Sequence, residues 1–211
     1  SLHLMLICYK RNNSCLISIV FVLLSFILVV YATYLTRSGV LAETSVHSFG
    51  NDGMGRQIMI YIGSMVIVGA ALIIRRIGLF RGNQTDNMFT REFWLYIASL
   101  IMVLSAFQII FSTSIPLINK VFGAGLAPPT DVVTYYNTWQ LPFAVVIAFL
   151  MGISQFIHWG RNQWPSFVRS VSVSLLLALV FTILIRLASI ADAPGHVFML
   201  FSALFALFSS L

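Results

Sequence analysis

The stretch CLISIVFVLLSFILVVYATYL, residues 15–35, decides the fold. It carries no charged side chain and is long enough to cross a bilayer, since a helical span takes roughly 17–25 apolar residues. Across the whole chain of 211 residues, 59% are hydrophobic and only 9% are charged. A water-soluble domain of that length needs far more charge to cover its surface, so the sequence predicts a multi-span membrane protein.

Other apolar runs of similar length follow the first. They should all be helices, because lipid offers no hydrogen bonds to the backbone of an open strand. We therefore predict an all-α, multi-pass transmembrane bundle of about six spans, forming one domain over residues 1–211. The expected spans are 15–35, 57–74, 93–114, 141–159, 171–190 and 196–211.

The start of the chain, SLHLMLICY, is apolar from the outset. It has no basic segment followed by a cleavage site, so we expect no signal peptide there. We interpret these residues as the end of an earlier helix within a larger protein.

Basic residues indicate the orientation of the spans. They gather in alternate loops, eight in one set against three in the other. Because Lys and Arg favour the cytoplasmic side, the larger set is expected inside, and the loops 36–56 and 115–140 are expected outside. The three basic residues on the outer side are Arg37, Arg56 and Lys120.

Two other classes of protein are disfavoured. The formal net charge of +6 is carried by residues at the ends of apolar runs, and no basic stripe on a soluble element indicates nucleic-acid binding. The two cysteines, Cys8 and Cys15, form no CxxC or CxxCH pattern. We therefore expect neither a disulfide framework nor covalent haem attachment.

Ionisable residues at membrane depth are few. The expected span interiors contain no Asp or Glu, which disfavours an ion-coupled transporter. Arg186 lies near the outer end of its span and can extend outward. His158 and His196 are expected at the membrane interfaces. His3 lies in an apolar helix and must find a partner, which can be a side chain, a backbone carbonyl or a metal.

The outer loop TRSGVLAETSVHSFG, residues 36–50, brings Arg37, Glu43 and His47 together in the sequence. An arginine near an imidazole suits an anionic cofactor with an iron centre, because haem propionates pair with Arg and haem iron takes His. From spacing alone, an ordinary polar loop explains the same residues slightly better.

The motif TRSGVL at 36–41, followed by SVHSF at 45–49, resembles the CcmF/CcsA family of cytochrome c maturation proteins. Further similarity lies in REFW at 91–94 and in the outer PP, YYN and P at 128–129, 135–137 and 142. The first motif is specific, and the others support it. The succession of spans and loops fits the family as far as about Trp164, and more loosely beyond.

The resemblance implies a haem lyase component of the bacterial inner membrane, which holds haem on the outer face and helps ligate it to apocytochrome c. His47 would be an axial ligand of the outer haem iron, and His3 an axial ligand of a separate b-type haem. Arg37 is our candidate partner for a haem propionate, with bracing of the loop as the alternative. Further partners would be haem-delivery or other cytochrome c maturation proteins, and membrane lipid.

Some features of the family pattern are absent. The chain lacks the tryptophan-rich W-x-W-D segment, the first outer histidine and the A-H-x-G motif of the second intramembrane histidine. We therefore expect the chain to be the middle of a larger protein or one product of a split gene. Alone it should bind haem poorly.

His3 and His47 are separated by a whole span in the sequence. At a rise of 1.5 Å per residue, they should lie roughly 30 Å apart and cannot ligate one iron. Two haem sites are therefore expected if both are ligands. The rival functions are a solute or ion transporter and a non-catalytic membrane scaffold subunit.

Overall fold

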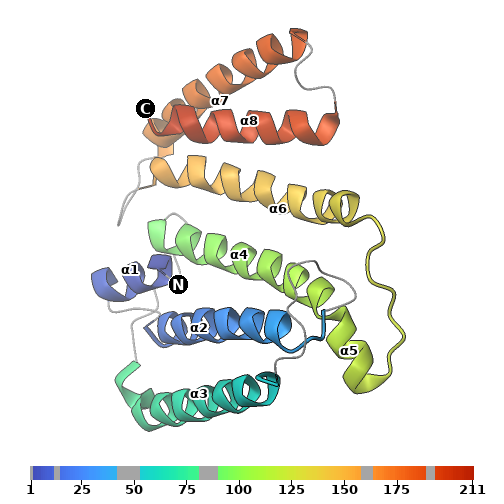
Figure 1. Cartoon of the computed structure of the whole chain (residues 1–211). Coiled ribbons are helices and arrows are strands. Elements are labelled where there is room, and N and C mark those ends of the chain that lie inside the picture. The colour runs from blue at the N-terminus through green and yellow to red at the C-terminus, as the bar shows by residue number, and fades with distance from the viewer. Residues whose placement is uncertain (1, 12–14, 42–52, 81–89, 158–163, 189–192) are drawn as a thin grey trace. The chain divides into compact units, whose positions relative to one another are not determined.

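The computed structural model describes residues 2–11, 15–41, 53–80, 90–157, 164–188 and 193–211. Every regular element in these ranges is a helix, which confirms the predicted all-α class (Figure 1). The elements are α1 (Leu2–Arg11), α2 (Cys15–Arg37), α3 (Gly55–Arg76), the 3-10 helix η1 (Ile77–Phe80), α4 (Arg91–Thr113), α5 (Ile115–Phe122), α6 (Val132–Gln155), α7 (Trp164–Leu187) and α8 (Pro194–Ser209).

Five of these helices, α2, α3, α4, α6 and α7, are long and apolar enough to cross a membrane. Each contains a stretch of 18 residues with strongly positive hydropathy and at most two charged residues. Helix α8 is also apolar but has only 16 residues. The structure therefore confirms a multi-pass helical membrane protein, with α8 at the place of the sixth expected span.

The chain divides into two compact units, where the sequence led us to expect one domain. The N-terminal unit comprises residues 1–85 and 110–128, and the C-terminal unit comprises residues 86–109 and 129–211. Helix α4 contributes residues to both. Each unit is described by itself below.

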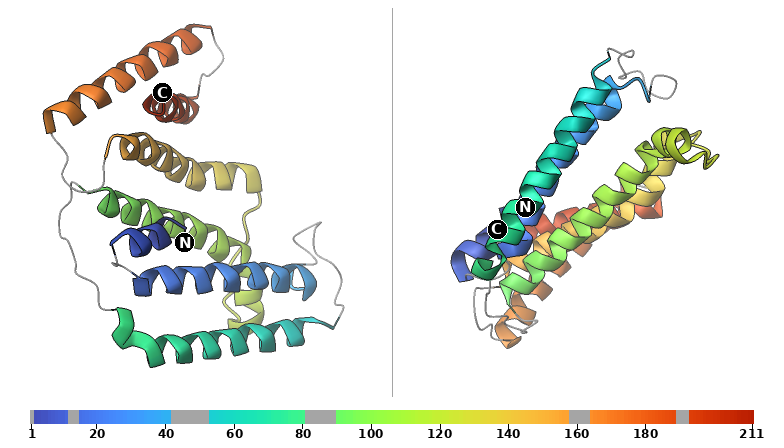
Figure 2. Two further views of the ribbon diagram at one scale, coloured as in Figure 1. Left: turned by 90° about the vertical axis from the view of Figure 1, so that its left-hand side faces the viewer. Right: turned by 90° about the horizontal axis from the view of Figure 1, so that it is seen from below.

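In the N-terminal unit, α2 lies between α1 and α3 and packs on both (Figures 1 and 2). A glycine at the contact with α3 permits this close approach. A Cβ atom added at Gly69 would lie only 2.4 Å from Cδ2 of Leu23. Small residues at helix contacts are typical of membrane proteins, where packing rather than exclusion of water holds helices together.

A disulfide joins Cys8 of α1 to Cys15 at the first residue of α2, with Cα atoms 4.7 Å apart. Our expectation of no disulfide was therefore wrong. The expectation rested on the absence of a CxxC motif, whereas the pairing arises from the fold. Helices α1 and α2 pack on each other, and this contact brings the two sulfur atoms together.

In the C-terminal unit, α8 packs against both α6 and α7. The centre of the α6–α8 contact is aromatic, since the ring of Phe149 lies 5.7 Å from that of Phe201 and 5.2 Å from that of Phe205. Phe205 is fully buried and lies over Gly152, which has no side chain to obstruct the ring. The contact with α7 includes a hydrogen bond of 3.2 Å, in which the Ser174 hydroxyl donates to the Phe208 carbonyl.

A second contact in the C-terminal unit is polar and joins α4 to α6. The Ser105 hydroxyl donates to Oε1 of Gln140 at 2.6 Å, and Nε2 of Gln140 donates to the Ser105 carbonyl at 3.2 Å and to Oε1 of Gln108. Nε2 of Gln108 in turn donates to the Tyr135 hydroxyl at 3.3 Å. Inside spanning helices these amides satisfy one another, which avoids the cost of leaving them unpaired in an apolar medium.

The expected loop 115–140 is largely helical, and this prediction needs correction. It contains α5, an irregular stretch, and the first turns of α6, which begins at Val132 rather than near residue 141. Asp131 caps α6, because its carboxylate accepts a hydrogen bond of 3.0 Å from the Thr134 backbone N–H. Hydrogen bonds from the side chain and backbone of Thr134 also lower the pKa of Asp131.

Candidate functional site

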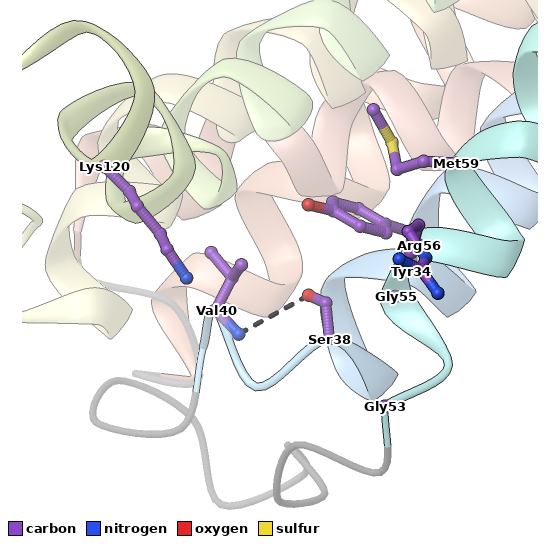
Figure 3. A pocket seen from close by; sticks show the side chains of 8 residues that line it. All are labelled: Tyr34, Ser38, Val40, Gly53, Gly55, Arg56, Met59 and Lys120. Carbon is purple, nitrogen blue, oxygen red and sulfur yellow. Dashed lines mark hydrogen bonds between the residues drawn. The ribbon is translucent and has the colours of Figure 1, made fainter.

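A recess of about 550 Å³ opens in the N-terminal unit where α2 ends and α3 begins. This volume lies within the usual range for small-molecule sites, roughly 300–1,000 Å³. Figure 3 shows its lining, which combines side chains from α2, α3, α5 and the segments that flank them. The lining residues are Tyr34, Ser38, Val40, Gly53, Gly55, Arg56, Met59 and Lys120.

The first wall comes from the end of α2. The helical hydrogen bonding continues to Ser38, whose N–H donates to the Tyr34 carbonyl at 2.9 Å. Gly39 then takes a φ of +69°, a conformation that glycine adopts without strain and that ends the helix. The Ser38 hydroxyl accepts a hydrogen bond from the Val40 N–H at 3.4 Å, which holds Val40 at the edge of the recess (Figure 3).

The second wall comes from the start of α3. Gly53 has a φ of +72° and leads into Gly55, the first residue of the helix. A Cβ atom at Gly55 would lie 3.1 Å from Cβ of Ser38, so the glycine lets the two helix ends approach closely. One turn of helix then brings Arg56 and Met59 to the recess.

Lys120 comes from α5, far along the chain. A hydrogen bond of 2.6 Å between the hydroxyls of Tyr31 and Ser114 joins α2 to the residue that precedes α5. At the other end of α5, the Asn119 side chain donates to the Leu126 carbonyl at 2.7 Å and accepts from its N–H at 2.8 Å. These contacts fix both ends of the short helix and hence the base of the Lys120 side chain.

The described lining of the recess carries a net positive charge. Among the described residues that line it, Arg56 and Lys120 are cationic and none is acidic. Figure 3 shows their side chains on opposite sides, with Tyr34 and Ser38 between them. Neither cation forms an ion pair with any residue in the described ranges. The hydroxyls of Tyr34 and Ser38 are further hydrogen-bond donors, so the arrangement suits an anion with several oxygen atoms.

The structure places the residues predicted from the sequence as follows. His3 lies exposed on α1, and Arg37 is the exposed last residue of α2; neither belongs to the described lining of the recess. His47 lies outside the described residues, as does His158. In the part of the chain that the structure describes, no group of three or more His, Cys, Asp or Glu residues is placed to hold a metal ion.

Two further residues were considered at the sequence level. Arg186, in the last turn of α7, is exposed, and so is His196 in the first turn of α8. These positions agree with interfacial roles at the helix ends.

Sequence reasoning missed Arg56 and Lys120 as site residues, although it had counted both as outer basic residues. Their separation in the chain hides their proximity in the fold. The sequence did contain a usable signal. The outer side of a membrane protein is usually poor in Lys and Arg, yet three basic residues are expected there. Basic residues that lie on the outer side despite this preference are candidates for binding an anion.

Known proteins similar to this chain are bacterial cytochrome c-type biogenesis proteins. The CcmF protein of Escherichia coli (strain K12) is 27% identical over 164 residues, which cover 77% of this chain and 24% of that protein. The CcmF protein of Haemophilus influenzae is 25% identical over 188 residues, covering 85% of this chain and 27% of that protein. The cytochrome c-type biogenesis protein ccl1 of Rhodobacter capsulatus is 26% identical over 188 residues, which cover 87% of this chain and 28% of that protein.

The chain thus spans about a quarter of the length of the curated relatives it matches. No protein-family model matches it, and no solved structure does. The similarity to these relatives nevertheless extends over most of this chain.

Proposed function

Because this chain is related to the CcmF family of cytochrome c-type biogenesis proteins over most of its length, we propose that it acts in cytochrome c maturation in the bacterial inner membrane. The observation that carries the proposal is agreement among several such relatives at 25–27% identity. The five membrane-spanning helices support the assignment to a membrane.

We propose haem as the ligand, in one outer site and one b-type site. The outer site would use the region of the recess, whose cations suit the carboxylates of haem and whose volume suits a small molecule. In the sequence, His47 lies between Val40 and Gly53, and both of these residues line the recess. The cations and hydroxyls of the described lining suit an anionic ligand, and His47 would supply the iron ligand.

His47 is proposed as an axial ligand of the outer haem iron, and His3 as an axial ligand of the b-type haem. Neutral imidazole is a common ligand of haem iron. Arg37 keeps its proposed role as a partner of a haem propionate or as a brace of the 36–56 loop. Arg37 is the last residue of α2 and directly precedes Ser38, which lines the recess.

The proposed partner is apocytochrome c, with haem-delivery and other maturation proteins of the same pathway. Haem supplies the vinyl groups to which the partner's cysteine thiols add, and this chemistry belongs largely to the cofactor. The task of the chain is to hold and orient the haem at the membrane surface. The haem lyase activity belongs to the whole protein and is proposed on the same grounds.

A reduced-minus-oxidised absorption spectrum of native membranes tests the proposal. The wild-type protein is compared with His47→Ala, His3→Ala and a matched control, His196→Ala, at equal protein level. We expect each of the first two substitutions to remove a distinct fraction of the haem signal. The control should leave both fractions intact, because His196 lies at the start of α8 and no ligand role is proposed for it.

Retention of all haem in both variants would remove the proposed ligands. A wild-type protein without haem, in membranes that still mature cytochrome c, would point to a scaffold subunit. Substrate-dependent flux in proteoliposomes, without haem, would support a transporter instead.

A further inference from the structure

We propose that Arg56 and Lys120 together bind the propionate carboxylates of haem in the recess, with the Tyr34 and Ser38 hydroxyls as supporting donors. This inference rests on the proposed function, because it names the residues that recognise the acidic edge of the haem. It differs from the role considered for Arg37, which lies outside the described lining.

Charge is the first argument. Two cations from different helices, Arg56 of α3 and Lys120 of α5, line one recess without a neighbouring carboxylate among the described lining residues. Like charges brought to one site repel each other, so the arrangement is favourable when an anion lies between them. A guanidinium binds a carboxylate through two parallel hydrogen bonds, whereas an ammonium acts as a point charge with adjustable donors.

The neutral donors are the second argument. Tyr34 and Ser38 lie between the two cations in Figure 3 and can donate to the same ligand oxygens. The first backbone N–H groups of α3 also begin at this recess, since Gly55 and Arg56 are its first two residues. A helix start adds partial positive charge and reinforces the preference for an anion.

The shape of the recess is the third argument, and it distinguishes haem from a lipid headgroup. Both present oxyanions, and both are available at the end of a spanning helix. The recess, however, also has apolar walls from Val40 and Met59 and the ring of Tyr34. A volume of about 550 Å³ with apolar and cationic walls matches the edge of a planar apolar ring that carries carboxylates.

The experiment compares binding of haem and of haem dimethyl ester, whose carboxylates are neutral. The purified full-length protein is reconstituted in nanodiscs of phosphatidylcholine, and binding is titrated by absorption. The variants are Arg56→Gln, Lys120→Gln and the double substitution. Arg75→Gln is the matched control, because Arg75 is a basic residue in the last turn of the same helix, α3.

We expect the wild-type protein to prefer haem to its dimethyl ester. Each single substitution should weaken haem binding about three- to tenfold, a modest effect because both residues are exposed, and should leave ester binding unchanged. The double variant should bind haem and ester equally. The Arg75→Gln control should keep the wild-type preference.

Unchanged preference for haem in the double variant would overturn the inference and leave the proposed function intact. A wild-type protein that binds neither haem nor ester would remove both. A third arm repeats the titration with phosphatidylglycerol in the nanodiscs. If the variants alter only retention of this anionic lipid, the recess holds a lipid headgroup and the inference is wrong.

Discussion

In two places in this protein a glycine lets neighbouring helices approach closely, but the space around the two glycines differs. Where α6 meets α8, a Cβ atom at Gly152 would lie 2.5 Å from the ring of Phe205, so the aromatic ring fills the available room. Where α2 ends beside α3, a Cβ atom at Gly55 would lie 3.1 Å from Cβ of Ser38. The first contact is closed by an aromatic side chain, and the second opens directly into the recess.

The difference lies in what surrounds each glycine. Gly152 faces aromatic residues of α8 that fill space and need no hydrogen bonds. Gly55 faces Ser38, which follows the end of α2, and the charged residues of the same recess, Arg56 and Lys120, are exposed. Close helix approach therefore produces a tightly packed aromatic contact in one unit and an open recess in the other.

The largest expected effect comes from enlarging Gly152. Replacing it with Leu forces Phe205 out of its buried position and should destabilise the protein by about 2–3 kcal/mol, as overpacked cores do. Unfolding in a titration with dodecyl sulfate, followed by tryptophan fluorescence, measures the change. Gly63→Ala is the control, because a Cβ atom there meets nothing within 4 Å. Equal stability of wild type and Gly152→Leu would show that the α6–α8 contact is loose.

The polar contact between α4 and α6 should respond less strongly. Gln140→Leu removes its hydrogen bonds to Ser105 and Gln108, and we expect a loss of about 1–2 kcal/mol. The same titration measures it, and a double-mutant cycle with Gln108→Leu gives the coupling energy. Ser172→Ala is the matched control, because that hydroxyl bonds only within its own helix. A coupling near zero would mean that the two glutamines do not interact.

Tyr31→Phe tests the link between α2 and the start of α5. The Ser114 hydroxyl donates to the Ile110 carbonyl, so the Tyr31 hydroxyl is the donor in the bond to Ser114. Its removal should cost about 1 kcal/mol. It should also weaken haem binding at the recess slightly, because Lys120 follows on α5. Tyr61→Phe is the control, and a larger effect of this control would argue against the proposed link.

The smallest effect concerns pH. Hydrogen bonds from Thr134 lower the pKa of Asp131 below its ordinary value of 3.8. The stabilisation is therefore fully present above about pH 4 and is lost as the pH falls through the lowered pKa. Asp131→Asn keeps an acceptor for the helix cap but does not titrate. The difference in thermal midpoint between wild type and variant should be constant at pH 5–7 and smaller at pH 3. A difference that stays constant from pH 7 to pH 3 would contradict this prediction.

The helices themselves could be predicted from the sequence because lipid leaves few alternatives for long apolar runs. The start of α6 could not be placed by hydropathy, since its first turns carry Tyr135, Tyr136 and Asn137 and are polar for a span. A readable signal was present in Asp131, a favourable capping residue three positions before Thr134. The prediction rested on hydropathy alone and did not use that signal.

The recess could be predicted only in part. The TRSG motif drew attention to the end of α2, where Ser38 does line it. The pairing of Arg56 with Lys120 depends on the path of the chain through α4 and α5, which no local pattern records. The Cys8–Cys15 disulfide was missed for the same kind of reason, because it depends on the packing of α1 against α2.

That disulfide makes the protein a natural reporter of its own membrane topology. The charge rule assigns Lys10 and Arg11, between the two cysteines, to the cytoplasm, where thiols are normally kept reduced. If the rule holds, freshly isolated cells contain Cys8 and Cys15 as a neighbouring dithiol, which an impermeant maleimide reaches only after the membrane is opened. An intact bond in such cells would instead assign this turn to the oxidising side and the 36–56 loop, with its haem-ligand candidate, to the cytoplasm.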